Sequence, residues 1–245
     1  MVKSSNQKPL PPPENLPHAL IWQRMEERRK DRKLSYLSIT NAAMELADQV
    51  GLEGLSMRSL AERLEAGTMT LYRYVTDRDD LLDLILDHAF GEIKVPTRAT
   101  KDWRKDITSV AVATRATMLR HPWLATLLIQ RPTLGPNYLR WFEFVLSSTS
   151  SIGKNLDTQL DMVGVIWAFI FGSVSYEVGE AENNRRHQLT EEKKQTIAEP
   201  YLSGLLATGQ FPQLAKVIAS PRQPNPLKAF RFGLKSVLDG LVQNV

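Results

Sequence analysis

The side chains best suited to chemistry lie between Ser56 and Arg78, a segment that combines hydroxyl, aromatic and cationic groups. In its second half Leu71 and Val75 are four residues apart, so they share one helix face, which we expect to be buried. The opposite face then carries Thr68, Met69, Thr70, Tyr72, Arg73 and Tyr74. Small hydroxyls let a helix end approach base edges, and aromatic or cationic groups reach phosphates, so this face suits contact with DNA.

A second short helix is predicted before the helix that contains Leu71 and Val75. Ser56 has the residue type of an N-cap, and the apolar positions after it predict a helix that ends at Leu64. Glu65, Ala66 and Gly67 then interrupt the periodicity and predict a tight turn. Two short helices joined by a tight turn, the second with a polar exposed face, predict a helix-turn-helix that reads DNA.

A longer pattern around these helices carries a family resemblance. The runs AAMELADQVGLEGLS, MRSLAERL and TLYRYVTDRDDLL, within residues 42–82, resemble the N-terminal domain of the TetR (tetracycline-repressor) family. One departure falls in the turn, where the family usually has Gly–Val and this chain has Glu65–Ala66. We expect Ala66 to fill the inward position loosely, and Glu65 to be strained if the turn needs a positive φ. An acid near DNA phosphates is also expected to weaken binding.

The resemblance implies a set of DNA contacts in this chain. It places Met69 and Arg73 at the base edges, whereas Leu71 and Val75 belong to the core. Phosphate contacts are expected from Ser56, Tyr72, Tyr74 and Arg78. The complete expected set is Ser56, Arg58, Thr68, Met69, Thr70, Tyr72, Arg73, Tyr74 and Arg78.

Composition sets bounds on the class of protein. The chain has 245 residues, a formal net charge of +4 and a sequence pI of about 9.3, a mild basic balance that favours a polyanionic partner. It has no cysteine, which excludes disulfides and thiolate metal sites and fits a reducing compartment. Since no apolar run follows the first lysine, we expect no signal peptide and a cytoplasmic protein.

The pattern predicts three parts. Residues 1–33 form a flexible basic extension, in which prolines precede an apolar patch that includes Leu20, Ile21, Trp22 and Met25. Residues 24–33 carry six cations against three acids, which is typical either of an arm that follows DNA phosphates or of a solvated charged helix. Residues 34–94 form the helix-turn-helix domain. A break at Val95–Thr97 separates it from a helical domain over 97–245.

Every periodic segment is helical, so we expect an all-α fold without a sheet. Gly51 suits a helix stop, and Asp77 suits the N-cap of the next long helix, over 78–93. A mobile polar loop is expected over 183–192. The later helices are expected over 103–120, 122–130, 136–151, 157–184, 191–206, 211–219 and 227–242.

Metal and catalytic sites are not indicated. The acids Asp79, Asp80, Asp83 and Asp87 are expected on a solvated face, with only His88 as a possible further ligand. His121 is expected to cap a helix end or to pack, and the four histidines are scattered without ligand spacing. Because no nucleophile motif or phosphate-binding glycine loop occurs, we expect no cofactor and no enzyme.

Aromatic residues after residue 97 raise the possibility of a binding pocket. The runs LRHPWL, LGPN and FRFGLKSVLDGL are similar to a common type of TetR C-terminal domain, which implies a helical domain that binds an effector. For the aromatic side chains of this domain, which include Trp123 and Phe142, the alternative to a pocket is ordinary core packing. The expected ligand-binding subset is Trp103, Met118, Tyr138, Trp141, Trp167 and Phe171, which suits a flat, apolar compound.

The apolar run Met162–Tyr176 is shorter than the roughly 20 residues of a membrane span, so a protein-buried helix is expected and no membrane partner. Gly164, Ala168 and Gly172 recur every four residues, a stripe that lets another helix approach closely. The resemblance implies a two-fold homodimer that pairs this helix and the last one. Two reader helices about 34 Å apart would then read a near-palindrome in double-stranded DNA.

The sequence therefore predicts a transcriptional regulator, a repressor that a small apolar effector releases from its operator, with helix 78–93 as the link between domains. Two other classes stay open. One is a small-molecule-binding protein of the same fold that has lost specific DNA binding, for which the Glu65–Ala66 turn is the reason. The other is a helical enzyme, which would need an acid–base pair and would reveal itself by turnover of a bound compound.

Overall fold

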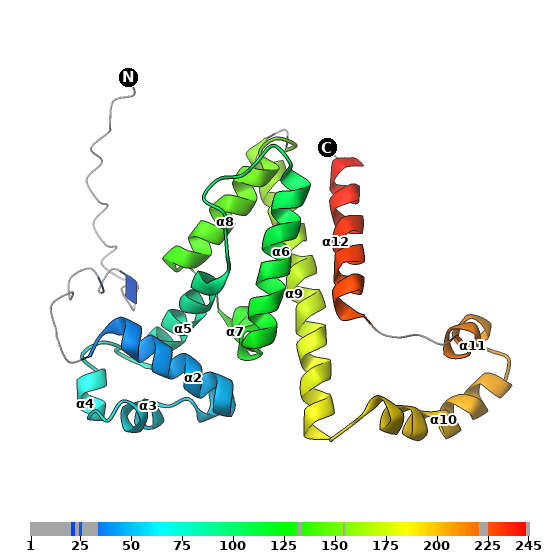
Figure 1. The fold of residues 1–245 in the computed structure, drawn as a ribbon, viewed down its shortest axis with the longest axis horizontal. Helices are drawn as coiled ribbons and strands as arrows, with labels where there is room; N and C mark the ends of the chain where they lie inside the picture. Colours follow the sequence, from blue (N-terminus) through cyan, green and yellow to red (C-terminus); the bar gives the residue numbers. More distant parts are fainter. Residues whose placement is uncertain are drawn as a thin grey trace. The chain divides into compact units, whose positions relative to one another are not determined.

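The computed structural model of the chain describes Ile21, Trp22, Met25 and residues 34–131, 134–153, 155–220 and 225–243. Every regular element within these ranges is a helix, which confirms the all-α fold class (Figure 1). Most of the expected extension over 1–33 lies outside the described residues. The chain divides into two compact units, one of residues 1–88 with 133–136, the other of residues 89–132 with 137–245. This division falls inside a helix, and the domain boundary at Val95–Thr97 stays a prediction.

The first unit contains α2 (Tyr36–Gly54), α3 (Met57–Arg63), α4 (Thr68–Leu71) and most of α5 (Arg78–Glu92). Their apolar stripes meet in a core that includes Ile39, Ala43, Leu60, Leu71, Leu81 and Ile85. α2 is capped by Ser35, whose side chain accepts a hydrogen bond from the Ser38 amide at 3.0 Å. The core holds α3 and α4 in contact with each other and α3 against α2.

The signals for helix starts and stops that the sequence predicts are found in the first unit. Gly51 has a φ of 72° and interrupts the regular helix, after which helical residues resume as far as Gly54. Ser56 is the N-cap of α3, and its hydroxyl accepts from the Ser59 amide at 3.0 Å. Asp77 caps α5 by accepting from the Asp80 amide at 2.9 Å. The sequence signals at Gly51, Ser56 and Asp77 are therefore confirmed.

The expectation that the α5 acids form a solvated face is wrong for two of them. Asp80 and Asp87 are buried, although Asp79 is exposed and Asp83 is half-buried. The Asp80 carboxylate accepts a hydrogen bond from the Thr76 amide at 2.6 Å, which compensates its burial. Asp87 packs against Gly135, where a Cβ atom would lie 2.1 Å from the carboxylate oxygen. The chain segment at Gly135 therefore covers an acid that spacing alone places in solvent.

The second unit is arranged around α9 (Leu156–Arg186). This helix contacts α6 (Trp103–Arg120), α7 (Trp123–Gln130) and α12 (Pro226–Gln243), and α8 (Pro136–Thr149) contributes Trp141, Phe144 and Val145 to the core. Buried apolar residues of this unit include Ile107, Val110, Met118, Val163, Ile166, Ile170, Val174, Phe230 and Leu234. α9 is long and apolar enough to cross a membrane by length and composition alone, but here it packs within a helical bundle.

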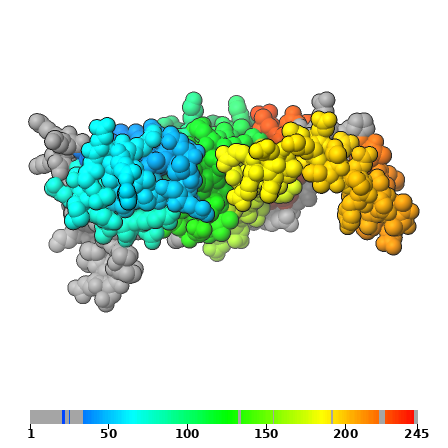
Figure 2. Space-filling model, turned by 90° about the horizontal axis from the view of Figure 1, so that it is seen from below, coloured from blue at the N-terminus to red at the C-terminus, as the bar shows by residue number. Residues whose placement is uncertain are grey.

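Two further helices, α10 (Glu191–Ala207) and α11 (Pro212–Ile218), extend away from α6, α9 and α12 (Figures 1 and 2). The expected polar loop over 183–192 is wrong at both ends, because α9 continues to Arg186 and α10 already begins at Glu191. An i,i+3 ion pair between Glu182 and Arg185 and cations in the last turn favour the longer helix. The remaining turn contains Gln188 with a φ of 50°.

Candidate nucleic-acid interface and aromatic cluster

The reader helix α4 is a short element whose side chains divide into a buried and an exposed set. Leu71 and Val75 are buried, as the four-residue spacing predicts. The exposed set contains Thr68, Met69, Thr70, Tyr72 and Arg73, and Met69 is 77% exposed. Helical hydrogen bonds continue beyond Leu71, since the Val75 amide donates to the Leu71 carbonyl at 3.0 Å. A rigid turn therefore presents two hydroxyls, a thioether, a phenol ring and a guanidinium to solvent.

Tyr74 does not belong to this exposed face, so its expected position is wrong. The residue is 7% exposed, and its hydroxyl donates to the Leu34 carbonyl at 2.8 Å. Its ring meets Tyr36 edge-to-face with centroids 5.4 Å apart. Because the helix turns by about 100° per residue, Tyr74 lies next to the buried face of Leu71 and not opposite to it. In this structure the phenol ties the start of α2 to the reader helix.

The remaining expected contacts flank the reader helix. Ser56 is exposed, although its hydroxyl also caps α3. Arg58 pairs with Glu62 at 3.0 Å, but its side chain is largely exposed, so this i,i+4 pair is weak and the guanidinium can exchange it for a phosphate. Arg78 donates to the Leu52 carbonyl at 2.7 Å. Arg78 thus holds the end of α2 against the start of α5, a role that spacing did not predict.

The turn between α3 and α4 contains the strained residue that the sequence predicts. Glu65 has a φ of 50°, in the left-handed region that favours glycine. The Ala66 amide donates to the Ala61 carbonyl at 3.0 Å and the Glu65 amide to the Glu62 carbonyl at 3.2 Å, the two bonds of a Schellman motif. The turn thus has the positive φ under which the sequence predicts strain at Glu65, and Ala66 is half-buried. A left-handed non-glycine residue costs about 1 kcal/mol or slightly more.

Replacing Glu65 by glycine should therefore raise the free energy of unfolding by about 0.5–1 kcal/mol, since the strain relief is partly offset by the greater freedom of glycine in the unfolded chain. Glu65→Gln keeps the Cβ atom but removes the charge, so it should leave the stability nearly unchanged. Thermal unfolding of the two variants beside the wild type measures the difference. Equal stabilisation by glutamine and glycine would show that charge, not backbone strain, dominates at this turn.

The second unit contains a connected cluster of rings, which we call the aromatic cluster: Phe90, Tyr138, Trp141, Phe142, Trp167 and Phe171. Trp141 is central, with its ring centroid 5.2 Å from that of Trp167 and 6.3 Å from that of Phe90. The indole N–H of Trp141 donates to Thr114 at 3.0 Å, and the Thr114 hydroxyl donates to the Val110 carbonyl at 2.8 Å. The buried polar atoms at its centre are thus satisfied.

Four members of the aromatic cluster are only half-buried, namely Tyr138, Phe142, Trp167 and Phe171. Burial of the Tyr138 hydroxyl nevertheless raises its pKa, which keeps it a neutral hydrogen-bonding group at neutral pH. Exposed ring faces with a neutral phenol suit stacking against a flat, weakly polar compound. Among the described residues no group of three or more His, Asp or Glu side chains could hold a metal ion.

The structure brings together most, but not all, of the residues expected to bind a ligand. Tyr138, Trp141, Trp167 and Phe171 belong to the aromatic cluster. Trp103 has the Arg104 guanidinium 4.7 Å from its ring centroid and is not a member of the aromatic cluster, while Met118 is buried in the core. Sequence reasoning missed Phe90, because its place in the apolar stripe of α5 gives it no distinguishing signal. Ring contacts across helices become visible only in the fold.

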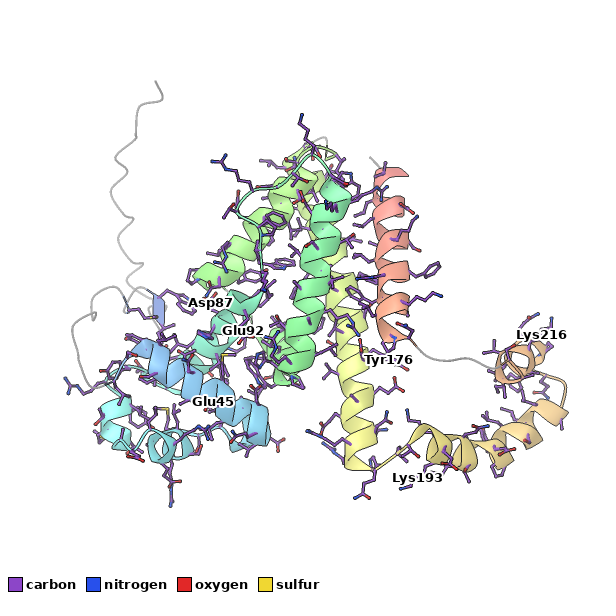
Figure 3. All side chains as sticks on the ribbon, viewed as in Figure 1. Glu45, Asp87, Glu92, Tyr176, Lys193 and Lys216 are labelled. Atoms are coloured by element: carbon purple, nitrogen blue, oxygen red, sulfur yellow. The ribbon has the colours of Figure 1, made fainter. Side chains whose placement is uncertain are left out.

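The junction after α5 is held by a small polar cluster. Glu92, labelled in Figure 3, pairs with the Arg120 guanidinium and lies 3.1 Å from the His121 ring nitrogen. His121 is buried and caps the end of α6. Its ring lies beside the Trp123 ring, with the two ring centroids 5.6 Å apart. The expectation that His121 caps or packs is confirmed. The end of α5 is thus fixed to the corner between α6 and α7.

A helix-turn-helix with an exposed polar reader helix, followed by a helical bundle, defines a transcriptional regulator of the helix-turn-helix type. Comparison with known proteins extends this conclusion. Residues 39–85 match the family model of bacterial regulatory proteins of the tetR family, and residues 95–245 match the tetracyclin repressor-like C-terminal domain. The chain therefore belongs to the TetR family of transcriptional regulators, which confirms the resemblance found in its sequence.

Individual relatives support the same family. The chain is 34% identical over 229 residues to the HTH-type transcriptional repressor DrrR1 of Streptomyces coeruleorubidus, covering 91% of this chain and 83% of the relative. It is 37% identical over 180 residues to an HTH-type transcriptional regulator of Saccharopolyspora erythraea, and the match covers 73% of this chain and 74% of the relative. Among solved structures, ActR of Streptomyces coelicolor without ligand matches with a TM-score of 0.72 and 26% identity over 87% of this chain and 97% of that chain.

ActR has also been solved with ligands. Its complex with actinorhodin matches this chain with a TM-score of 0.70 and 28% identity, covering 86% of this chain and 98% of that chain. A second complex contains (S)-DNPA. These similarities cover both units of the present chain.

Proposed function

We propose that this regulator is a cytoplasmic repressor whose first unit binds a near-palindromic operator and whose second unit dimerises and accepts an effector. The exposed face of the reader helix carries the proposal, because buried Leu71 and Val75 fix the helix while Met69 and Arg73 remain open to solvent. Arginine is the side chain best suited to a guanine edge, and flanking hydroxyls suit phosphates. The proposed contacts are Ser56, Arg58, Thr68, Met69, Thr70, Tyr72 and Arg73, while Tyr74 and Arg78 act by positioning.

Selection from a pool of random DNA at about 0.15 M salt tests this proposal. The wild type should enrich a near-palindrome, and Arg73→Ala should weaken binding to it by about 1–3 kcal/mol, or roughly 5- to 150-fold. Tyr72→Ala should also weaken binding, because the exposed phenol is placed to reach a phosphate. If the wild type enriches no sequence, even after refolding to remove a co-purified effector, the operator proposal fails.

A homodimer is supported by the exposed apolar surface of α9 and α12. Gly164, Ala168 and Gly172 are exposed, and a Cβ atom at either glycine would meet nothing within 4 Å. Tyr176 on α9 (Figure 3) and Phe232 on α12 are 76% and 75% exposed. Large exposed apolar side chains beside a flat stripe favour close helix pairing with a second copy of the same surface. One short reader helix also makes few contacts, so two copies supply specificity.

Charged residues at this surface should separate the dimer. Phe232→Glu and Tyr176→Glu each place two like charges in a desolvated two-fold interface, so both variants should sediment as monomers at micromolar concentration. Leu139→Glu, at an exposed leucine of α8, is the matched control and should remain dimeric. A wild type that sediments as a monomer would contradict the proposed homodimer.

The proposed effector is a small, flat and largely apolar compound. Its support is the set of half-buried rings in the aromatic cluster, together with the neutral Tyr138 hydroxyl. ActR, which is 28% identical to this chain, has been solved with actinorhodin. An operator obtained by selection can be used to screen planar aromatic compounds for release. Release requires that the compound bind better to a form with lower operator affinity.

A second candidate function is a small-molecule-binding protein of the same fold without specific DNA binding. The left-handed Glu65 in the turn favours it, because this residue adds both strain and negative charge where DNA phosphates would lie. The selection experiment separates the two functions. Binding of planar aromatic compounds without enrichment of any DNA sequence would establish this candidate, and recovery of selection by Glu65→Gly would identify the turn as the cause.

A further inference from the structure

An apolar side chain from before the DNA-binding helices is buried in their core. Ile21 is 1% exposed and forms one buried cluster with Val75 and Leu84, which we call the Ile21 cluster. Trp22, Met25, Tyr36 and Met57 are partly buried and pack against it. Ile21 precedes residue 39, where the match to the tetR family model begins. The helix-turn-helix of this chain is therefore completed by a residue outside the matched region.

The members of the Ile21 cluster come from the elements that set the position of the reader helix. Val75 lies one helical turn after the buried Leu71 of the reader helix, and Leu84 lies in the middle of α5. Met57 is the first residue of α3, and Tyr36 is the first residue of α2. Protein interiors are packed without spare volume, so a side chain at the meeting point of several helices fixes their separation.

We propose that Ile21 is a positioning residue for DNA reading, which holds the reader helix against α5 through Val75 and Leu84. This inference rests on the proposed operator binding. Ile21 itself is buried and contributes no group to DNA. Its loss should therefore affect the fit of the reader helix to base edges, while the charge of the protein and its attraction to phosphates stay the same. Loss of Ile21 should therefore weaken binding to the operator but leave binding to unrelated DNA unchanged.

The test measures affinity of the full chain for the selected operator and for unrelated DNA over a range of salt concentrations. Ile21→Ala should lower operator affinity about tenfold or more, with unchanged affinity for unrelated DNA and an unchanged salt slope. Ile21→Leu keeps the buried volume and should restore most of the operator affinity. Ile107→Ala is the matched control, since Ile107 of α6 is also 1% exposed and loses the same atoms but belongs to the second unit. It should change operator affinity by no more than about twofold.

Circular dichroism shows that each variant is folded at the assay temperature. If Ile21→Ala does not fold, Ile21→Val and Ile107→Val provide the same comparison with a smaller cavity. Equal loss of operator affinity in the Ile21 and Ile107 variants would overturn the proposal, because general destabilisation would explain both. A parallel loss of non-specific affinity and salt slope would overturn it in favour of a charge effect of the N-terminal residues. A wild type without operator binding would instead refute the proposed function itself.

Discussion

Replacing Trp141 by alanine should lower the free energy of unfolding by about 3–5 kcal/mol, the largest effect expected in this protein. The side chain is almost fully buried and forms the centre of the aromatic cluster. Its removal leaves a cavity between α8 and α9 and also leaves the Thr114 hydroxyl without its indole donor. Chemical denaturation with urea measures the change, provided that the slope with denaturant stays constant.

Trp141→Phe separates the contribution of ring packing from that of the hydrogen bond to Thr114. Phenylalanine retains the ring contacts to Phe90 and Trp167 but removes the hydrogen bond to Thr114, so its cost should be about 1–2 kcal/mol. Phe142→Ala, at a half-buried ring of the same helix, should cost less than Trp141→Ala because it deletes less buried surface. A loss below about 1 kcal/mol for Trp141→Ala would contradict the central position of this residue in the core.

The second large effect is expected at the ion pair between Arg115 on α6 and Glu177 on α9. Two hydrogen bonds join them, at 3.0 Å and 2.5 Å, and the side chains are only 12% and 25% exposed. The Arg115 guanidinium also lies 5.8 Å from the Phe230 ring centroid, so it connects α6, α9 and α12. Arg115→Ala should destabilise the protein by about 2–3 kcal/mol, because it leaves a carboxylate with little access to water and without its partner.

A double replacement distinguishes the cost of an unpaired charge from the net contribution of the pair. Arg115→Met combined with Glu177→Leu removes both charges and keeps apolar volume, so its stability should lie within about 1 kcal/mol of the wild type. The exposed pair between Lys235 and Asp239 is the control, and Lys235→Ala should cost less than about 0.5 kcal/mol. A double variant as unstable as Arg115→Ala would show that the ion pair itself stabilises the bundle.

Local signals in the sequence were sufficient for helix positions and caps. Ser56 and Asp77 cap the helices that their residue types predict, and the departure in the turn identifies Glu65 as the residue that a positive φ strains. These features depend on residues within one or two turns of each other, so the local sequence contains the information. The long helices α6, α9 and α12 follow from apolar periodicity for the same reason.

Contacts between distant segments could not be predicted in this way. The acidic helix face places Asp87 in solvent, yet Gly135, which lies 48 residues further along the sequence, covers it. Helix spacing alone places Tyr74 on the DNA face, yet its hydroxyl donates a hydrogen bond to the Leu34 carbonyl. Phe90 joins the aromatic cluster only through helices brought together by folding. In each case the deciding partner is remote in sequence.

The most direct test of DNA reading by α4 and the turn that follows it is a comparison of selected DNA sequences. Arg73→Gln and Met69→Ala would each be subjected to the same random-pool selection as the wild type. If Arg73 and Met69 contact bases, each variant should enrich a near-palindrome altered at one pair of symmetry-related positions, because glutamine prefers adenine where arginine prefers guanine. Enrichment of an unchanged near-palindrome with uniformly lower affinity would contradict base reading and would assign both residues to phosphate contacts.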